Sequence, residues 1–225
     1  MGHRIQLTSK DGHRLSAYIA EPDAAARGGL VVAMEMYGVN DYLTGVCDGW
    51  AADGYLAIAP LLWDRYERDL TLPYDEAGSA RGKAMSLDIA ANMAATLDDL
   101  AAAADRVRNA GKVGIVGFCL GGTVAWLAAC RRDFDAALPY YGSNMCDYPD
   151  DVPRCPVLCH VGALDTAVPP DDIAAFAASR PEPQWRVYDG VQHGFDNSLR
   201  PARHDRDAAS LARERSRAFL AEHVG

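Results

Sequence analysis

The chain lacks the features that mark membrane-spanning and nucleic-acid-binding proteins. No run of 18 apolar residues is present, and a helix that crosses a bilayer would need one. Asp and Glu number 31 against 22 Lys and Arg, which gives a net charge of −9. Nucleic-acid-binding proteins usually carry a basic patch. We therefore expect neither a membrane nor a nucleic-acid partner.

The chain also lacks the spacings of metal, nucleotide and secretion motifs. Its six cysteines form no CxxC pair and no metal-finger pattern. The glycines around 114–122 do not fit G-x-G-x-x-G, and no Lys-Ser/Thr follows them as in a P-loop. The first residues enter an alternating strand pattern at once, without a leader. We expect a cytoplasmic protein with reduced thiols, no metal and no cofactor.

What is present predicts a single α/β domain over residues 1–225. No repeat or interdomain linker interrupts the chain, and 225 residues can bury a large core. Short apolar runs, bounded by Gly and Pro, alternate with helical patterns. Strands are expected at 5–8, 15–20, 30–34, 55–59, 113–117, 137–141, 156–161 and 184–188, and helices at 42–53, 76–109 and 205–223. This order predicts a mostly parallel sheet of about eight strands, flanked by helices on both faces.

The most informative segment is Gly117-Phe118-Cys119-Leu120-Gly121-Gly122, which lies between an apolar strand and a helical stretch. A strand, a tight glycine-flanked turn and a helix form a nucleophile elbow, which usually carries Ser. Small flanking residues are needed because the strand and the helix approach closely there. The helix N-terminus favours an anion, which helps a thiolate and an oxyanion alike. An isolated Cys is more often a buried apolar filler, so the interpretation of Cys119 depends on its partners.

An acid and a base follow in the required order. Asp165 comes directly after the strand at 156–161, and His193 comes after the strand at 184–188. Nucleophile, acid, base is the chain order of an α/β-hydrolase triad, and both loops lie at the carboxyl edge of a parallel sheet. Either residue alone would be an ordinary turn or loop residue. His160 lies inside an apolar strand, and we interpret it as a hydrogen-bonded core histidine.

The chain resembles the dienelactone hydrolase (carboxymethylenebutenolidase) family, a cysteine-dependent branch of the α/β-hydrolases. The motifs that carry the resemblance are Met34–Asn40, Gly111–Gly122, Tyr140-Tyr141-Gly142, Asp165–Pro169 and His193-Gly194-Phe195. They are spaced through nearly the whole chain. The resemblance implies the α/β-hydrolase fold and hydrolysis of a lactone or ester.

The resemblance also implies roles for individual residues. Cys119 would attack the carbonyl carbon, His193 would take and return the proton, and Asp165 would orient the imidazole. The backbone N–H groups of Leu120 and Met36 would form the oxyanion hole.

Glu35 would lie near the resting cysteine and help to control its ionisation. A carboxylate beside a thiol disfavours a second negative charge and can accept the thiol proton. Because Glu35 ends the apolar run at 30–34, a freely solvated loop carboxylate is the less favoured interpretation.

One departure from the family pattern concerns the substrate. Dienelactone enzymes of the family hold the substrate carboxylate with arginines, one of them four residues beyond the catalytic His. That position is Asn197 here, and Gly194 stands where those enzymes have Ser. A bidentate Arg is the strongest carboxylate anchor among side chains. Arg81, Arg200 and Arg203 are candidates to replace it; otherwise the substrate is a different ester or lactone.

The wall of the substrate pocket can also be assigned in part. The segment 63–69 mixes aromatic and charged residues and is either a solvated loop or part of the pocket. We take Trp63 from this segment, with Arg81, Asn197 and Phe195, as candidate substrate contacts.

The leading functional hypothesis is a Cys-His-Asp hydrolase of a small lactone or ester. The expected substrate is a dienelactone of aromatic-compound degradation, cleaved through a thioester acyl-enzyme by a monomer. One alternative is a carboxylesterase or thioesterase of broader specificity with the same triad, which Asn197 keeps open. Another is a binding protein without catalytic activity on a hydrolase scaffold, since a fold alone does not determine function.

Overall fold

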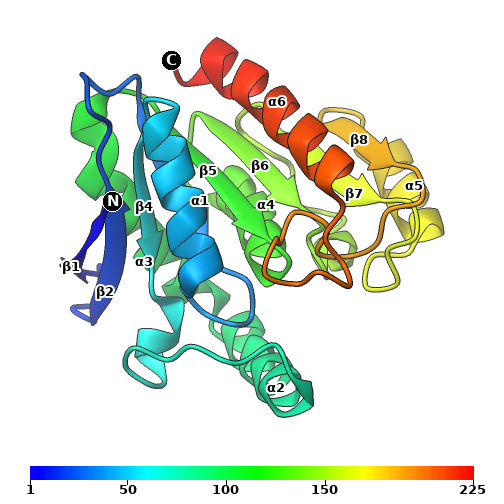
Figure 1. Cartoon of the computed structure of the whole chain (residues 1–225), viewed down its shortest axis with the longest axis horizontal. Coiled ribbons are helices and arrows are strands. Elements are labelled where there is room, and N and C mark those ends of the chain that lie inside the picture. Colours follow the sequence, from blue (N-terminus) through cyan, green and yellow to red (C-terminus); the bar gives the residue numbers. More distant parts are fainter.

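The computed structural model describes all 225 residues and contains one eight-stranded sheet (Figure 1). The strands are β1 (His3–Thr8), β2 (Arg14–Ala20), β3 (Gly29–Ala33), β4 (Leu56–Pro60), β5 (Val113–Phe118), β6 (Ala136–Tyr140), β7 (Leu158–Gly162) and β8 (Gln184–Tyr188). Their order in the sheet is β1-β2-β4-β3-β5-β6-β7-β8. β2 pairs antiparallel with β1 and β4, and all other neighbours are parallel. The predicted α/β fold with a mostly parallel sheet is confirmed.

Helices cover both faces of this sheet. They are α1 (Asp41–Ala52), α2 (Glu76–Ala91), α3 (Met93–Val107), α4 (Leu120–Arg131), α5 (Pro170–Ser179) and α6 (Arg206–His223). In Figure 1, α1 and α6 lie in front of the sheet, and α3 and α4 lie behind it. No helix combines the length and the apolar character that crossing a bilayer requires.

The central strands β3, β4 and β5 are buried at every residue, because helices cover them on both faces. Their Val, Leu, Ile, Ala and Gly residues form continuous apolar runs, which are typical of parallel strands in the middle of a sheet. From β3 to β8 the strands run in one direction, so the loops that follow them meet at one edge. This edge carries the candidate site.

The prediction of one continuous helix over 76–109 is wrong. The structure contains two helices, which meet at Asn92 with φ −115° and ψ 32°. The side-chain amide of Asn92 donates to the carbonyl of Asp88 at 2.9 Å, a local bond that competes with the helical pattern. α3 buries Met93, Leu97 and Leu100 in the hydrophobic core.

The interpretation of His160 as a satisfied core histidine is confirmed. Its ring is fully buried and bonds Tyr188 Oη at 2.8 Å and Ser216 Oγ at 3.0 Å. Burial lowers the pKa of His160 to about 3, so the ring stays neutral. The network is closed to solvent and takes no part in the candidate site.

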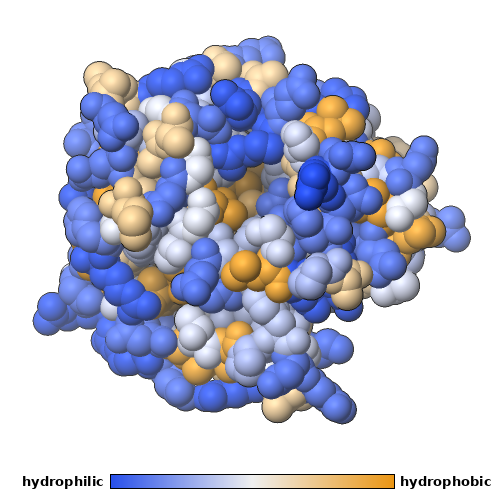
Figure 2. All heavy atoms as spheres, viewed as in Figure 1, coloured by the Kyte–Doolittle hydropathy of each residue, from blue (hydrophilic) through white to orange (hydrophobic).

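Most of the surface on the face shown in Figure 2 is hydrophilic, and its apolar residues form separate small patches. The largest exposed apolar side chains, such as Leu87 and Leu164, come from different elements. Patches of this size are ordinary for a globular protein.

Candidate active site

Cys119 lies on the sharp turn between β5 and α4. Its φ of 55° and ψ of −117° are in a region that residues other than glycine rarely adopt. The turn tolerates no bulk: a Cβ on Gly117 would lie 1.9 Å from the carbonyl oxygen of Gly121, and one on Gly121 would lie 2.2 Å from that of Ala33. The elbow geometry that the glycines predict is therefore present.

The structure brings Asp165 and His193 together beside this turn. His193 Nδ1 lies 2.8 Å from Asp165 Oδ2, and both side chains are buried. The other carboxylate oxygen of Asp165 accepts the backbone N–H groups of Ala167 and Val168 at 2.8 and 3.0 Å. Because the carboxylate is held on both oxygens, it fixes the imidazole plane and leaves Nε2 free for Cys119.

The electrostatics of the site favour a charged imidazolium. Burial disfavours the charged ring, but the neighbouring Cys119 side chain and the hydrogen bond that His193 Nδ1 donates to Asp165 Oδ2 outweigh it. Together they raise the pKa of His193 to about 10. A cysteine beside an imidazole that readily holds a proton is the arrangement that activates a nucleophilic thiol.

Glu35 lies two residues beyond β3 and is only 1% exposed. Its Oε2 accepts a hydrogen bond from Asn197 Nδ2 at 2.8 Å. Burial raises the pKa of Glu35 to about 7, and Asn197 and the charges of Arg200 and His193 limit that rise. The carboxyl therefore shares the site with the triad and titrates near neutral pH.

Asn197 does not line an open pocket, contrary to its expected role as a substrate contact. It is fully buried, and its amide nitrogen also donates to Tyr74 Oη at 2.9 Å. Its carbonyl oxygen accepts the backbone N–H of Leu199 at 3.0 Å. All of its polar atoms are engaged inside the protein, so Asn197 supports Glu35.

Two more predicted substrate contacts are core residues. Trp63 is 1% exposed and packs in the hydrophobic core. Phe195 is fully buried against Tyr141, with ring centroids 5.3 Å apart. Both predictions are corrected for the same reason: an aromatic side chain near a functional loop more often fills the core than lines the pocket. Arg81 lies on exposed α2 and pairs with Glu67.

The predicted oxyanion hole has unused donors. The backbone N–H of Leu120 begins α4, and that of Met36 lies in the loop after β3. Neither N–H donates to a protein acceptor. Gly82 of α2 packs against this loop so closely that a Cβ there would lie 2.9 Å from the carbonyl oxygen of Met36.

The structure adds Ser143 to the site and places Arg200, one of the three candidate arginines, beside it. Ser143 Oγ lies 3.2 Å from Cys119 Sγ. Arg200 stacks over Tyr37 and Tyr74, with its guanidinium carbon 5.2 and 5.3 Å from the ring centroids. The sequence gives no signal for the first contact, since it joins side chains 24 positions apart.

Arg200 has an unused charge beside the catalytic loop. It is half-buried and forms no ion pair with a carboxylate of the protein. A Cβ on Gly194 would lie 3.9 Å from Arg200 Nη1, which places the guanidinium next to the residue that follows His193. Arg203 is used differently, because its Nη1 donates to the carbonyl oxygen of His193 at 3.3 Å.

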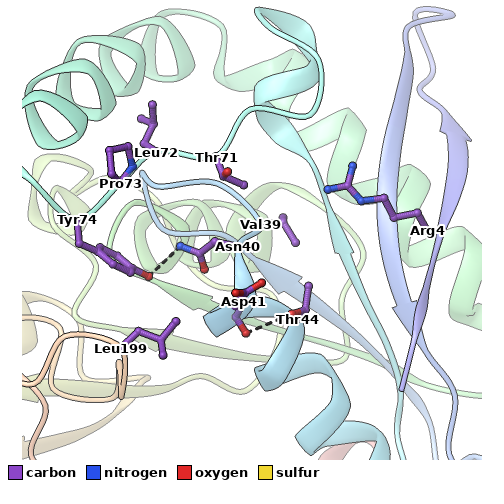
Figure 3. Close-up of a pocket in the computed structure, with 10 residues that line it drawn as sticks. All are labelled: Arg4, Val39, Asn40, Asp41, Thr44, Thr71, Leu72, Pro73, Tyr74 and Leu199. Atoms are coloured by element: carbon purple, nitrogen blue, oxygen red, sulfur yellow. Dashed lines mark hydrogen bonds between the residues drawn. The ribbon is translucent and has the colours of Figure 1, made fainter.

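An open groove of about 610 Å³ adjoins the site on the far side of Tyr74 (Figure 3). It is lined by Arg4, Val39, Asn40, Asp41, Thr44, Thr71, Leu72, Pro73, Tyr74 and Leu199. No triad residue lines it. The hydroxyl of Tyr74 accepts hydrogen bonds from Asn40 Nδ2, which lines the groove, at 2.8 Å and from Asn197 Nδ2, which bonds Glu35, at 2.9 Å. No group of three or more His, Cys, Asp or Glu side chains is placed to hold a metal.

Known proteins resemble this chain over nearly its whole length. Residues 15–224 match the model of the dienelactone hydrolase family. The chain is 34% identical to carboxymethylenebutenolidases of Pseudomonas putida and of Pseudomonas knackmussii, over 96% of this chain and 95% of each relative.

Solved structures agree as well. A protein of Klebsiella pneumoniae subsp. pneumoniae MGH 78578, named provisionally as a dienelactone hydrolase, superposes with a TM-score of 0.80 at 25% identity, over 98% of this chain and all of the other. A dienelactone hydrolase-like promiscuous phosphotriesterase from metagenomic libraries shares the fold, with a TM-score of 0.75 at 21% identity over 100% and 99% of the two chains.

Proposed function

The chain belongs to the dienelactone hydrolase family and is a carboxylic ester hydrolase, and from this premise we propose that it cleaves a small lactone through Cys119. The proposed substrate is a dienelactone, which bears a carboxylate, and the proposed setting is the degradation of aromatic compounds. The observation that carries the proposal is the hydrogen bond between His193 and Asp165 beside Cys119, which lies on a strained elbow.

Acylation follows from the positions of these groups. The Cys119 sulfur attacks the lactone carbonyl carbon. The resulting oxyanion accepts hydrogen bonds from the free backbone N–H groups of Leu120 and Met36. The ring C–O bond then breaks, and His193 Nε2 gives its proton to the leaving oxygen. The product is a thioester in which the leaving group stays tethered to the acyl chain.

Deacylation reverses the proton transfer. Water attacks the thioester carbonyl carbon while His193 Nε2 takes its proton. The C–S bond breaks, the electron pair stays on sulfur, and the free acid leaves. Asp165 keeps the imidazole in the required tautomer throughout.

Arg200 is the proposed anchor for the substrate carboxylate. Its guanidinium lies beside the His193 loop without an internal anion, whereas the amide of Asn197 is fully used by Glu35 and Tyr74. A guanidinium held flat by two aromatic rings presents its N–H edge to a ligand. Arg81 is the competing candidate, but Glu67 already pairs with it.

The proposal is tested by ultraviolet-monitored hydrolysis of cis- and trans-dienelactone beside a neutral aryl ester. Cys119→Ala should abolish turnover of both substrates without unfolding the chain. Arg200→Gln should raise the KM for the dienelactone by about tenfold or more, since a charge-assisted bond of that kind contributes about 1.5–3 kcal/mol. Arg81→Gln is the matched control and should leave the KM unchanged.

The outcomes separate the alternatives. Turnover of the neutral ester alone would favour an esterase or thioesterase of broader specificity with the same mechanism. Activity that survives in Cys119→Ala would refute the proposed nucleophile. No Cys119-dependent turnover of any ester would favour a binding role on this scaffold. We also propose a cytoplasmic monomer that needs no cofactor; size-exclusion chromatography and assay of dialysed enzyme test the oligomeric state and the cofactor.

A further inference from the structure

A serine hydroxyl is held against the nucleophile by a rigid loop. Ser143 Oγ lies 3.2 Å from Cys119 Sγ and has no other hydrogen-bond partner in the protein. On one side, Gly142 packs so closely on α4 that a Cβ there would lie 2.9 Å from the backbone of Gly122. On the other side, the backbone N–H of Asn144 donates to Thr123 Oγ1 at 3.1 Å.

The backbone before Ser143 is equally constrained. Tyr141 has a φ of 40°, a strained value for a tyrosine, and its N–H donates to the carbonyl oxygen of His160 at 2.8 Å. Cys119 is strained too, and its N–H donates to the carbonyl oxygen of Tyr140 at 3.0 Å. Two strained segments are thus bonded into the same part of the sheet. Strain of this kind persists only where the surroundings over-determine it, so the contact between sulfur and hydroxyl is built into the fold.

Few other groups can donate a hydrogen bond to the sulfur. The titratable groups next to it are His193 after β8 and Tyr141 after β6, and Glu35 after β3 interacts with both of them. His193 is the proton carrier of the proposed mechanism and is bonded to Asp165. Glu35 is an acceptor when ionised and is bonded to Asn197. Ser143 Oγ lies within hydrogen-bond distance of the sulfur, whereas the buried Tyr141 hydroxyl bonds no partner. The uncharged serine hydroxyl can donate at every pH of interest.

We propose that Ser143 Oγ–H donates a hydrogen bond to the Cys119 sulfur whenever that sulfur carries negative charge, and thereby stabilises it as the leaving group of deacylation. The inference rests on the proposed function, in which Cys119 forms the acyl-enzyme. In deacylation, water adds to the thioester carbonyl carbon and loses its proton to His193. The C–S bond then breaks, and the electron pair passes to the sulfur that faces Ser143.

The Cys119 sulfur becomes a stronger hydrogen-bond acceptor during deacylation, and this sets the direction of the effect of Ser143 on the rate. A thioester sulfur is a weak acceptor, whereas a thiolate sulfur is a strong one, so the hydrogen bond strengthens as the C–S bond breaks. Ser143 therefore accelerates release of the acyl group. It also favours the thiolate over the thiol in the resting enzyme.

Two pairs of variants test this role: Ser143→Thr with Ser143→Val, and Ser143→Ala with Ser198→Ala. Ser143→Thr keeps the hydroxyl, and Ser143→Val has nearly the same shape without it, so this pair isolates the hydroxyl even where Ser143→Ala loosens the loop. Ser198→Ala is the control, because Ser198 is exposed. The rate of Cys119 alkylation by iodoacetamide is followed against pH by peptide mass spectrometry, which separates Cys119 from the other five cysteines. Deacylation is followed as the steady phase after an acylation burst.

In Ser143→Val and Ser143→Ala, the pH of half-maximal Cys119 alkylation should rise by about one unit, and deacylation should slow by about tenfold. Ser143→Thr, which keeps the hydroxyl, should have a lower midpoint and faster deacylation than Ser143→Val, and Ser198→Ala should behave like the wild type. An unchanged midpoint in Ser143→Val relative to Ser143→Thr overturns the proposal, and so does a lowered midpoint, since the hydroxyl would then accept from the thiol. The alkylation assay needs no substrate, so failure of the proposed function, seen as activity in Cys119→Ala, is recognised separately.

Discussion

Replacement of Glu35 by Gln should stabilise the protein at alkaline pH and much less at acid pH. Glu35 is a buried carboxyl with a neutral hydrogen-bond donor, Asn197, and no contacting cation. Glutamine has nearly the same shape and can still accept the Asn197 bond through its carbonyl oxygen. The substitution therefore removes the ionisation of Glu35 and preserves its packing.

The expected magnitude follows from the pKa of Glu35. Burial raises this pKa from 4.5 to about 7, and each unit corresponds to about 1.4 kcal/mol. The raised value means that the folded protein binds this proton more tightly than the unfolded chain does. The stability that the proton contributes is fully present below pH 4.5 and is lost as the pH rises through 7. The wild type should therefore lose about 3 kcal/mol across this range that Glu35→Gln retains.

Urea unfolding of both proteins at pH 5 and pH 8.5 measures this difference. The gain in unfolding free energy from Glu35→Gln should be larger at pH 8.5 than at pH 5 by about 2–3 kcal/mol. Glu182→Gln is the control, since Glu182 is exposed and should give no pH-dependent difference. His193 titrates in both proteins, so its contribution largely cancels in the comparison.

A gain that does not vary with pH would refute the reasoning. It would mean that Glu35 does not change its protonation relative to the unfolded chain between pH 5 and 8.5. A loss at pH 8.5 would show that the ionised carboxylate is stabilised by its surroundings, against the burial argument.

Three further substitutions probe the catalytic acid, the elbow and the support of the core. Asp165→Asn should lower kcat by about 10³–10⁴-fold with an unchanged circular dichroism spectrum, because the imidazole loses its tautomer partner; a loss below tenfold would contradict this. Gly121→Ala should destabilise by several kcal/mol in urea unfolding, since its Cβ would lie 2.2 Å from a backbone carbonyl of β3. Gly45→Ala, at an exposed position of α1 with open space around it, should instead stabilise by about 0.5–1 kcal/mol. Arg65→Met should cost about 3–5 kcal/mol in the same assay, because it leaves the fully buried Asp99 without the guanidinium that holds it at 2.6 and 2.7 Å; a loss near zero would show that Asp99 is solvated.

The sheet and the placement of Cys119, Asp165 and His193 could be predicted because both rest on local patterns. Apolar runs of strand length between helical segments are recognisable one by one. Once the strands are parallel, residues that follow them must meet at one edge. The break at Asn92 was missed because a single asparagine in an alanine-rich stretch weakens a helix without ruling it out.

The substrate contacts could not be predicted in the same way. Trp63, Phe195 and Asn197 all lie near functional motifs, yet each is buried in the structure. Whether such a side chain points into a pocket or into the core depends on packing between segments far apart in the sequence. Asn197 contacts a carboxylate 162 positions away, and no local pattern records that.

The buried contacts of Asn197 and of the two tyrosines have one effect in common: they keep the charges of Glu35 and Arg200 apart. The charge of Arg200 limits the rise in the pKa of Glu35, yet the two side chains form no ion pair. Asn197 occupies the carboxylate, and two tyrosine rings hold the guanidinium. An ion pair between them would hold Glu35 ionised and leave Arg200 no charge for a ligand. Keeping the two groups apart leaves a carboxyl that titrates near pH 7 and a cation without an internal partner. The neutral Asn197 is therefore better understood as the residue that keeps these two charges separate than as a missing substrate anchor.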